Sequence, residues 1–266
     1  MVTPSWNQGE FIEQTILSII NQEYSNYEYI VIDNQSSDRT HEVLEKYKNH
    51  ITELVVESDE GQTDALIKGF KKASGDIYCW LNADDTFTPN ALQTLVEKYQ
   101  QHPDSELWIG ATRFVDPKGK ILGHDCPPIP KLNPFHTGLD LLEFWGNGLH
   151  FMQPSVFFSS KAYEKVGGLN KRFDHLMDIE LWTKICLKGS IFTFDVVLSE
   201  MKIHRNQKSN KQINIREMEY ISLKHQYGLT EKALQHLEYF SLEKEKRYNF
   251  LQRMLHKANK ITRHYD

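Results

Sequence analysis

A polar segment with two adjacent carboxylates follows a short apolar run. Asp84 and Asp85 are preceded by Asn82 and come just after residues 77–81 (IYCWL). An apolar run of this length, with Pro89 soon after it, predicts a buried strand that delivers these polar side chains to its C-terminal end. Carboxylate and amide oxygens at a strand end can bind a hard divalent cation. A polar turn that caps the next helix explains the same residues, so this segment alone leaves both interpretations open.

The composition is typical of an ordinary globular protein. The chain has 266 residues, a formal net charge of -5 and 39% hydrophobic residues, so it can bury a core and has no basic surplus for nucleic acid. No apolar stretch reaches the roughly 18 residues of a membrane span, and no signal peptide is expected. The three cysteines lack a Cys-x-x-Cys spacing, which argues against a disulfide framework and favours a reducing, cytoplasmic location.

Four short apolar runs are expected to be strands separated by helices: residues 2–5, 29–33, 54–56 and 77–81. The first run is short for a central strand, so it is expected either to be abbreviated or to begin upstream of Met1. Thr88 is the expected N-cap of the helix after the fourth run, with Pro89 in its first turn. Single helices between strands predict a parallel, doubly wound sheet whose ligands lie beyond the strand C-termini. Asp33 and Asp84 both lie there.

A nucleotide bound at this sheet edge would lack a glycine cradle for its phosphates. The sequence has no Gly-x-Gly-x-x-Gly after the first strand and no Gly-x-x-x-x-Gly-Lys-Ser/Thr. A metal ion held at the acidic strand end could neutralise a diphosphate instead. The same absence argues against a nucleotidyltransferase, which would need a glycine- and lysine-rich phosphate loop near the first strand.

Several motifs occur in a fixed order over roughly residues 2 to 208. On the first half they are residues 2–7 (VTPSWN), 32–38 (IDNQSSD), 60–65 (EGQTDA) and 81–85 (LNADD). On the second half they are residues 153–155 (QPS), 163–169 (YEKVGGL), 177–182 (MDIELW) and 202–204 (KIH). Together they closely resemble family 2 glycosyltransferases, inverting enzymes with the GT-A fold.

The resemblance implies an α/β fold with a Rossmann-like, mixed and mainly parallel sheet flanked by helices. The expected GT-A domain covers residues 1–208, with a nucleotide-sugar half to about residue 110 and an acceptor half over 111–208. A helical C-terminal extension follows at residues 209–266. The implied reaction moves one sugar, with inversion, from a UDP-linked donor to an acceptor hydroxyl, in a setting such as bacterial surface polysaccharide or glycoconjugate assembly. The membrane helices and the Gln-x-x-Arg-Trp element of processive relatives are missing, which indicates addition of one sugar or a few.

For the donor, the resemblance implies a contact from Asp33 to the uracil base and from Asp64 to the base or ribose. A carboxylate suits an imide N–H donor. The alternatives are a turn or helix cap at Asp33 and a first-turn helix acid at Asp64. The other expected donor-site positions are Thr3, Pro4, Ser5, Asn82, Ala83 and Asp85.

Asp84 matches the second acid of the family's Asp-x-Asp element and is the expected ligand of Mn²⁺ or Mg²⁺. His204 resembles a late histidine that reaches the metal or the diphosphate, although a lone histidine can also be structural. Asn82 stands where the first acid usually is, so one negative charge is missing, but its amide could orient a ribose hydroxyl or a metal-bound water. Asp85 could compensate for the missing charge without binding the metal directly, or it could simply cap the turn. Two lysines could offset diphosphate charge: Lys202 and Lys208.

Asp178 is the expected catalytic base, because an inverting displacement needs a carboxylate to take the proton of the acceptor hydroxyl. It lies at the predicted start of a helix, where an acid can also serve only to favour the helix dipole. Glu180 points about 200° away around that helix and is a poorer partner. The positions expected on the acceptor side are Trp145, His150, Gln153 and Glu180.

The last fifty residues change in composition and predict two or three helices. Residues 243–266 contain seven Lys or Arg against three acids and a stripe of apolar residues. This helix could lie on an anionic membrane that holds a lipid-linked saccharide acceptor, or pack on the domain or on a second copy of the chain. A nucleotide-sugar-binding module without turnover is the alternative function, because Asn82 replaces an acid.

Overall fold

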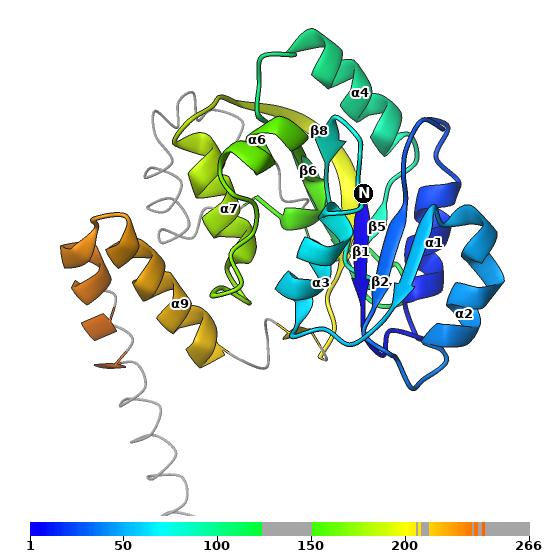
Figure 1. The fold of residues 1–266 in the computed structure, drawn as a ribbon, viewed down its shortest axis with the longest axis horizontal. Coiled ribbons are helices and arrows are strands. Elements are labelled where there is room, and N and C mark those ends of the chain that lie inside the picture. Colours follow the sequence, from blue (N-terminus) through cyan, green and yellow to red (C-terminus); the bar gives the residue numbers. More distant parts are fainter. Residues whose placement is uncertain (124–150, 206, 209–212, 236, 239–240, 243–266) are drawn as a thin grey trace, which may run out of the picture. The chain divides into compact units, whose positions relative to one another are not determined.

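The computed structural model describes residues 1–123, 151–205, 207–208, 213–235, 237–238 and 241–242. The chain divides into two units, Met1–Asn210 and Lys211–Asp266. The first unit contains a three-stranded and a five-stranded sheet with helices around them (Figure 1). The expected basic helix at residues 243–266 lies outside the described residues.

The first sheet is parallel and brings two polar loops to one edge. β1 (Val2–Ser5) pairs with β2 (Ile30–Asp33), and β2 pairs with β3 (Glu53–Val56). Ser5 lies opposite Asp33 in the register. The loops after β1 and β2 therefore start side by side.

The second sheet has the strand order β4-β7-β6-β8-β5. Its strands are β4 (Ile77–Tyr78), β5 (Thr86–Phe87), β6 (Leu107–Val115), β7 (Val156–Ser159) and β8 (Ile191–Lys202). Only β6 and β8 pair in parallel; the other neighbours are antiparallel. The two sheets are joined at their edges, since the N–H of Val2 donates to the carbonyl of Cys79 (3.1 Å) and the N–H of Leu81 to the carbonyl of Val2 (3.0 Å).

Helices cover both faces of the joined sheets, as Figure 1 shows for α1 and α2 on one side of β1 and β2 and α3 on the other. The helices of the first unit are α1 (Ile12–Ile20), α2 (Thr40–Tyr47), α3 (Gln62–Phe70), α4 (Ala91–Gln101), α6 (Ser160–Lys165) and α7 (Met177–Cys186). Two short 3₁₀ helices are η1 (Lys48–His50) and η2 (Gln153–Ser155). The mixed sheet between helices confirms the expected fold class.

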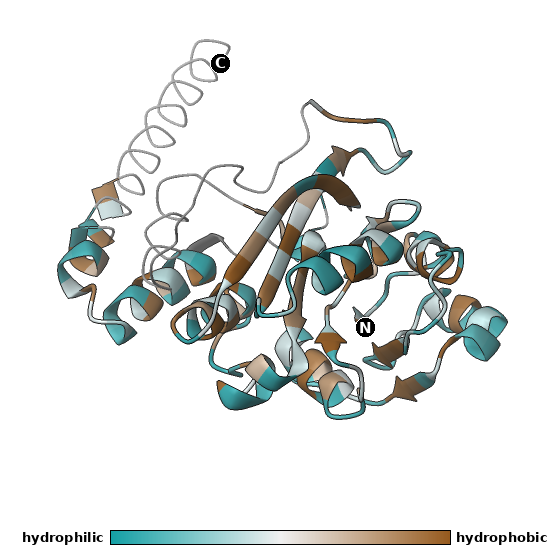
Figure 2. Cartoon of the chain, turned by 90° about the horizontal axis from the view of Figure 1, so that it is seen from above, coloured by the Kyte–Doolittle hydropathy of each residue, from teal (hydrophilic) through white to brown (hydrophobic). Residues whose placement is uncertain are grey.

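The alternation of side chains along residues 77–81, which begin with β4, separates two cores. Cys79 and Leu81 belong to a hydrophobic core shared with α1, α2 and α4. Tyr78 and Trp80 point the other way, into an aromatic cluster in which Trp80 stacks on Trp182 at 6.3 Å between ring centroids. This period of two is the one expected of a strand. Figure 2 shows mainly hydrophobic strands in the centre and mixed colouring on the surrounding helices.

Helix α3 approaches β1 closely at Gly69. A Cβ atom added at Gly69 would lie 2.4 Å from Cγ1 of Val2. We expect Gly69→Ala to lower the free energy of unfolding by about 1–3 kcal/mol, the usual cost of overpacking a core, measured by urea denaturation. Gly75→Ala is the control, because the nearest atom to its added Cβ, the carbonyl oxygen of Ile77, is 3.7 Å away. Equal losses in the two variants would contradict the steric argument.

Helix α4 begins at Ala91, so the expectation that Thr88 caps it is wrong. Asn90, with a left-handed φ of 62°, takes the N-cap position. The N–H of Thr88 donates to the carbonyl of Leu198 (2.9 Å) and its hydroxyl donates to the carbonyl of Val197 (2.8 Å). Thr88 therefore extends the contact of β5 with β8, and its side chain is not available to the helix.

The second unit contains α9 (Ile213–Gln226) and a further helical stretch at residues 230–235. The turn between them is closed by the N–H of Leu229, which donates to the carbonyl of Lys224 (2.9 Å). Within the described part of the chain, no helix combines the length and the apolar character needed to cross a membrane.

Candidate active site

The loops that follow β1 and β2 are hydrogen-bonded to each other at the sheet edge. The N–H of Asn7 donates to Oγ of Ser36 (2.8 Å), and Oδ1 of Asn7 accepts from the N–H of Ser37 (2.9 Å). Next to this junction Trp6 is 62% exposed, so an aromatic face is available at the same edge. Nothing in the sequence pattern distinguishes Trp6 from a core aromatic residue, and it was not among the expected site residues.

Asp33, the expected contact to the base, closes the turn after β2. It is 1% exposed. Its Oδ2 accepts from the N–H of Ser36 (2.8 Å) and its Oδ1 from the hydroxyl of Ser36 (2.7 Å). A carboxylate oxygen can accept more than one hydrogen bond. Capping the turn and contacting a ligand are therefore compatible at Asp33.

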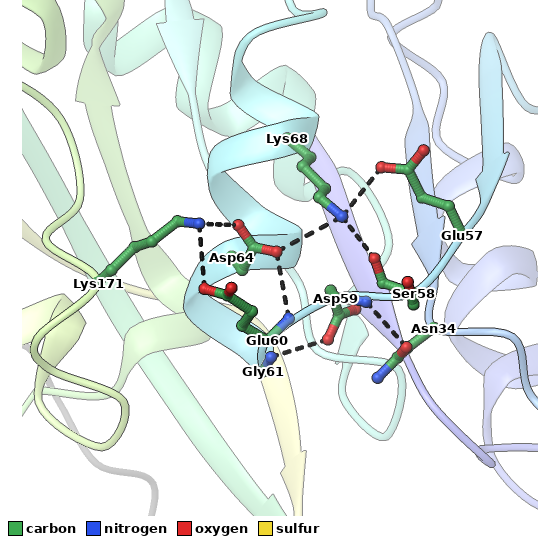
Figure 3. A network of polar contacts seen from close by, with 9 residues as sticks. All are labelled: Asn34, Glu57, Ser58, Asp59, Glu60, Gly61, Asp64, Lys68 and Lys171. Atoms are coloured by element: carbon green, nitrogen blue, oxygen red, sulfur yellow. Dashed lines mark hydrogen bonds and ion pairs between the residues drawn. The ribbon is translucent and has the colours of Figure 1, made fainter.

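A network of polar contacts surrounds Asp64 in the first turn of α3 (Figure 3). Its Oδ1 lies 2.6 Å from Nζ of Lys171, and its Oδ2 accepts from the N–H of Glu60 (3.2 Å) and lies 3.5 Å from Nζ of Lys68. Burial opposes ionisation of Asp64, but Lys171, the Glu60 N–H and Lys68 outweigh it and lower its pKa. A nucleotide that used this carboxylate would have to share it with Lys171.

The same network holds the start of α3 against the end of β2. Oδ1 of Asn34 accepts from the N–H of Asp59 (3.0 Å), and Oδ1 of Asp59 accepts from the N–H of Gly61 (2.9 Å). Gly61 precedes the helix with a φ of 122°, a value that favours glycine. The segments that carry Asp33 and Asp64 are thereby connected.

The segment after Leu81 alternates between half-buried and buried side chains. Asn82 and Asp84 are half-buried, whereas Ala83 and Asp85 are buried. Of these residues, expected as donor-site positions or, for Asp84, as a metal ligand, Asn82 and Asp84 are the two whose side chains are partly exposed. Three further expected positions are buried in β1: Thr3, Pro4 and Ser5.

Asp84 and His204, the two expected metal ligands, are brought together from distant parts of the sequence. Oδ2 of Asp84 lies 3.0 Å from Nε2 of His204. A carboxylate accepts hydrogen bonds, so this contact is a hydrogen bond when Nε2 carries a proton, and the same two atoms can instead face a metal ion when it does not. The imidazole also packs against Phe11, with 4.7 Å between ring centroids. The histidine is therefore held at the end of β8, facing the strand end that carries Asp84.

The donor atoms of Asp84 and His204 fit a divalent first-row metal ion, which accepts both carboxylate oxygen and imidazole nitrogen. Among the described residues, no group of three or more His, Cys, Asp or Glu is placed to hold a metal. Protein ligands alone would leave coordination positions open. Ions such as Mg²⁺ are commonly bound by one or two carboxylates together with substrate phosphates, so this pair fits a metal bound together with a diphosphate.

Behind Asp84, a carboxylate and an amine share a buried environment. Asp85 and Lys202 are each 2% exposed. Burial, reinforced by the charge of Asp84, raises the pKa of Asp85 well above its usual range. Burial lowers the pKa of Lys202, opposed by the charges of Asp85 and Asp84. Because the Nζ of Lys202 is buried, this lysine acts on the charge of the acidic segment from inside the protein and does not offer its amine at the surface.

Asn82 lies between two glutamines. Its Oδ1 accepts from Nε2 of Gln62 (2.7 Å), and its Nδ2 donates to Oε1 of Gln153 (3.2 Å). Gln153 in turn donates from Nε2 to the carbonyl of Trp80 (2.7 Å). Gln62 was not among the expected site residues, although it lies within the motif at residues 60–65. Gln153, expected on the acceptor side, has its side chain bonded to the strand end.

Asp178 occupies the second position of α7 and is half-buried, as expected for an acid near a helix start. Its Oδ1 accepts from the N–H of Ile179 (2.8 Å). Glu180 is 1% exposed and forms an ion pair with Lys184 (2.9 Å). The two acids on α7 therefore have different environments. The expected acceptor residues Trp145 and His150 lie outside the described residues.

The segment that leads to Asp178 is attached to α3. The hydroxyl of Thr63 donates to the carbonyl of Phe173 (2.8 Å). Nζ of Lys208 lies 2.7 Å from Oδ2 of Asp174. Together with the ion pair at Asp64, these contacts connect the start of α7 to the helix that borders the donor-side motifs.

Comparison with known proteins finds relatives in sequence and in fold. A Rickettsia conorii protein named "Uncharacterized glycosyltransferase" is 28% identical over 218 residues, which are 79% of this chain and 35% of that protein. The chain thus spans about a third of that relative. S. aureus TarS 1-349 in complex with UDP-GlcNAc superposes with a TM-score of 0.64 at 15% identity, covering 84% of this chain and 63% of TarS 1-349. Mannosyltransferase PcManGT from Pyrobaculum calidifontis, in complex with GDP-Man and Mn²⁺, gives 0.60 at 19% identity, covering 85% and 62%.

These two solved structures support the fold, and the family follows from the sequence match. The profile of "Glycosyl transferase family 2" matches residues 1–167, well over half of the chain. The matched region contains the polar loops after β1 and β2, the start of α3, the Asn82–Asp85 segment and η2. The chain therefore belongs to glycosyl transferase family 2.

Proposed function

We propose that this glycosyltransferase moves one sugar, with inversion, from a UDP-linked donor to an acceptor hydroxyl. The observation that carries the proposal is the meeting of Asp84 and His204 at the edge where β1 and β2 also end. A metal-and-diphosphate site and a base-and-ribose site would then be neighbours. The complexes of TarS with UDP-GlcNAc and of PcManGT with GDP-Man and Mn²⁺ support such a donor and such an ion.

In this proposal, the donor nucleotide lies along the sheet edge. The Asp33 carboxylate, which already accepts from Ser36, accepts in addition from the imide N–H of the base, and the exposed ring of Trp6 can pack on the base face. Asp64 contacts the base or the ribose while it keeps its ion pair with Lys171. Asn82 orients a ribose hydroxyl or a metal-bound water.

Asp84 and His204 would hold Mn²⁺ or Mg²⁺. Such an ion, when bound, offsets the charge that develops on the departing diphosphate. Asp85 and Lys202 affect the charge of this segment from their buried positions. A neutral Asp85 would leave Asp84 as the main charge of the segment. Burying the Lys202 amine next to Asp84 adds positive potential at the same place.

Asp178 is the proposed base. A half-buried carboxylate at a helix start is accessible enough to meet an acceptor hydroxyl and to accept its proton as the new glycosidic bond forms. The proton moves from the hydroxyl to a carboxylate oxygen, and the bond to the diphosphate breaks on the opposite side of the anomeric carbon. Glu180 is excluded from this role because it is buried against Lys184.

The proposed acceptor is a carbohydrate or lipid-linked saccharide in bacterial surface polysaccharide assembly, and the proposed location is cytoplasmic, including the inner membrane surface. Attachment to an anionic membrane or to a second copy of the chain, through residues 243–266, is part of the same proposal. It rests on sequence composition alone.

Thermal stability measured with nucleotides tests the donor site directly. We expect UDP with Mn²⁺ to raise the melting temperature, because a ligand specific to the folded state adds about 2.7 kcal/mol of stability at a hundred times its dissociation constant. UDP without a divalent ion should give a smaller rise. GDP with Mn²⁺ is the nucleotide control, and an equal response to it would argue against a uracil-specific site.

An assay of UDP release on the same protein preparation distinguishes an enzyme from a binding module without turnover. An active transferase is expected to release UDP slowly from UDP-sugar by transfer to water or to added saccharides. Binding of UDP-sugar with no release, across a panel of acceptors, would favour the module.

A further inference from the structure

The hydrogen bonds around Asn82 continue on both sides of this residue. They form a series in which every hydrogen bond is donated in the same direction. Nζ of Lys208 donates to Oε1 of Gln62 (3.4 Å), and Gln62 donates to Oδ1 of Asn82 (2.7 Å). Asn82 donates to Oε1 of Gln153 (3.2 Å), and Gln153 donates to the carbonyl of Trp80 (2.7 Å). We call these five residues the amide relay.

Both ends of the amide relay fix its direction. The ammonium group of Lys208 can only donate, and the backbone carbonyl of Trp80 can only accept. Each amide between them must therefore present its oxygen toward Lys208 and its nitrogen toward Trp80. The orientation of an amide is usually assigned from its surroundings, and here the two ends leave one assignment.

We propose that Gln62 and Gln153 are positioning residues that orient the Asn82 amide, and that position 82 carries an amide because an acid cannot take part in this relay. The proposal deepens the proposed function, since it assigns both glutamines to the donor site. It also moves Gln153 from the acceptor side to the donor side. The substrate class involved is the nucleoside diphosphate part of the donor.

An aspartate at position 82 would place an acceptor where Asn82 now donates to Gln153. Nδ2 of Asn82 lies 3.2 Å from Oε1 of Gln153. A carboxylate oxygen in place of Nδ2 would face this oxygen without a proton between them. Gln153 cannot relieve this by turning its amide, because its oxygen would then face the carbonyl of Trp80.

The direction of the hydrogen bonds in the amide relay also explains how Gln62 and Gln153 affect a ligand. The Oδ1 of Asn82 receives one hydrogen bond from Gln62 and keeps a second acceptor position. Its Nδ2 is occupied by Gln153 and Asp85. Asn82 therefore offers an acceptor, directed by its neighbours, to a ribose hydroxyl or a metal-bound water.

A double-mutant cycle in ligand-free protein tests the relay without any assumption about the substrate. Asn82→Asp and Gln153→Lys should each lower the melting temperature. A lysine at position 153 can donate both to an acid at position 82 and to the carbonyl of Trp80. The double variant should therefore be more stable than Asn82→Asp alone, and strictly additive losses would overturn the relay.

Gln62→Glu keeps the test informative if the variants at positions 82 and 153 do not fold. It changes the half-buried surface end of the relay, where a fold defect is not expected. A carboxylate there can still accept from Lys208 but cannot donate to Asn82. UDP affinity with Mn²⁺ should fall by roughly 10- to 100-fold, the usual effect of removing an outer partner of a site. Unchanged affinity would remove Gln62 from the donor site.

Gln153→Glu, compared with Gln22→Glu, separates positioning from general destabilisation. Gln22 is also half-buried and donates to the carbonyls of Ser18 (2.8 Å) and Thr88 (2.9 Å), away from the site. Both variants should lose stability, but only Gln153→Glu should weaken UDP binding and raise the donor KM by roughly tenfold or more. A raised acceptor KM with unchanged donor KM would overturn the donor-side assignment.

The two proposals fail in different ways. If wild-type protein binds no UDP with Mn²⁺, the proposed donor is wrong, while the ligand-free cycle still decides whether the relay exists. If wild-type protein binds UDP and the cycle is additive, the donor stands and the relay is wrong.

Discussion

Asp178→Asn is expected to reduce turnover by about a hundred- to ten-thousand-fold, the usual contribution of a general base. The substitution keeps the size of the side chain and an oxygen that can accept from the N–H of Ile179. It removes the group that takes the acceptor proton. Donor affinity should be nearly unchanged, because the proposed donor contacts lie on β1, β2, α3 and the strand end at Asp84. Steady-state kinetics together with UDP-sugar binding would measure both quantities.

Glu180→Gln is the matched control on the same helix. Glu180 is buried and paired with Lys184, so the control should lose thermal stability while keeping turnover below its melting temperature. The expected pattern is thus a stable, inactive Asp178→Asn and a less stable, active Glu180→Gln. The reverse pattern would show that the base is misassigned.

Asp84→Ala is expected to abolish the stabilisation that Mn²⁺ adds to UDP. It removes the carboxylate nearest to His204, and losing a metal ligand should cost more than the roughly 10- to 100-fold caused by losing an outer partner. The fold should survive, since Asp84 is half-buried at the sheet edge. Calorimetric titration of UDP with and without Mn²⁺ would show whether the difference between the two conditions disappears.

Asp116→Asn provides the control for loss of a carboxylate. Oδ1 of Asp116 accepts from the N–H groups of Lys118 (2.8 Å) and Lys120 (2.9 Å) in an exposed turn, so it has a local structural role only. Metal-dependent UDP binding should be unchanged in this variant. Retention of the Mn²⁺ effect in Asp84→Ala would remove Asp84 from the metal site.

Local patterns in the sequence were sufficient to locate the elements of the donor side, but not all of their ends. The acid at the end of residues 29–33 predicts a strand end correctly, since β2 ends at Asp33. The apolar run at residues 77–81 is a strand only at Ile77–Tyr78, with one further bridge from Trp80 to Val2, so its expected end at Leu81 is wrong. Thr88 shows a second failure. Its hydroxyl could cap a helix nearby or bond to a strand far away in sequence, and the contact with Val197 prevails.

The polar partners of the site could not be predicted, because they come from separate elements. Gln62 and Gln153 are ordinary glutamines in the sequence, and their common partner Asn82 appears only when α3 and η2 reach the same strand end. The burial of Lys202 is similar. As a lysine in a strand it is expected at the surface, yet in β8 it is 2% exposed, and its amine is influenced by the charges of Asp85 and Asp84.

All hydrogen bonds of the amide relay are donated in one direction, and this has a consequence for how the sequence can evolve. Asparagine and aspartate codons differ by the smallest possible change, so an acid at position 82 is always within mutational reach. Here, that change would set an oxygen against the side-chain oxygen of Gln153. We therefore expect positions 82 and 153 to covary among relatives, with an acid at the first position accompanied by a donating side chain such as lysine or arginine at the second.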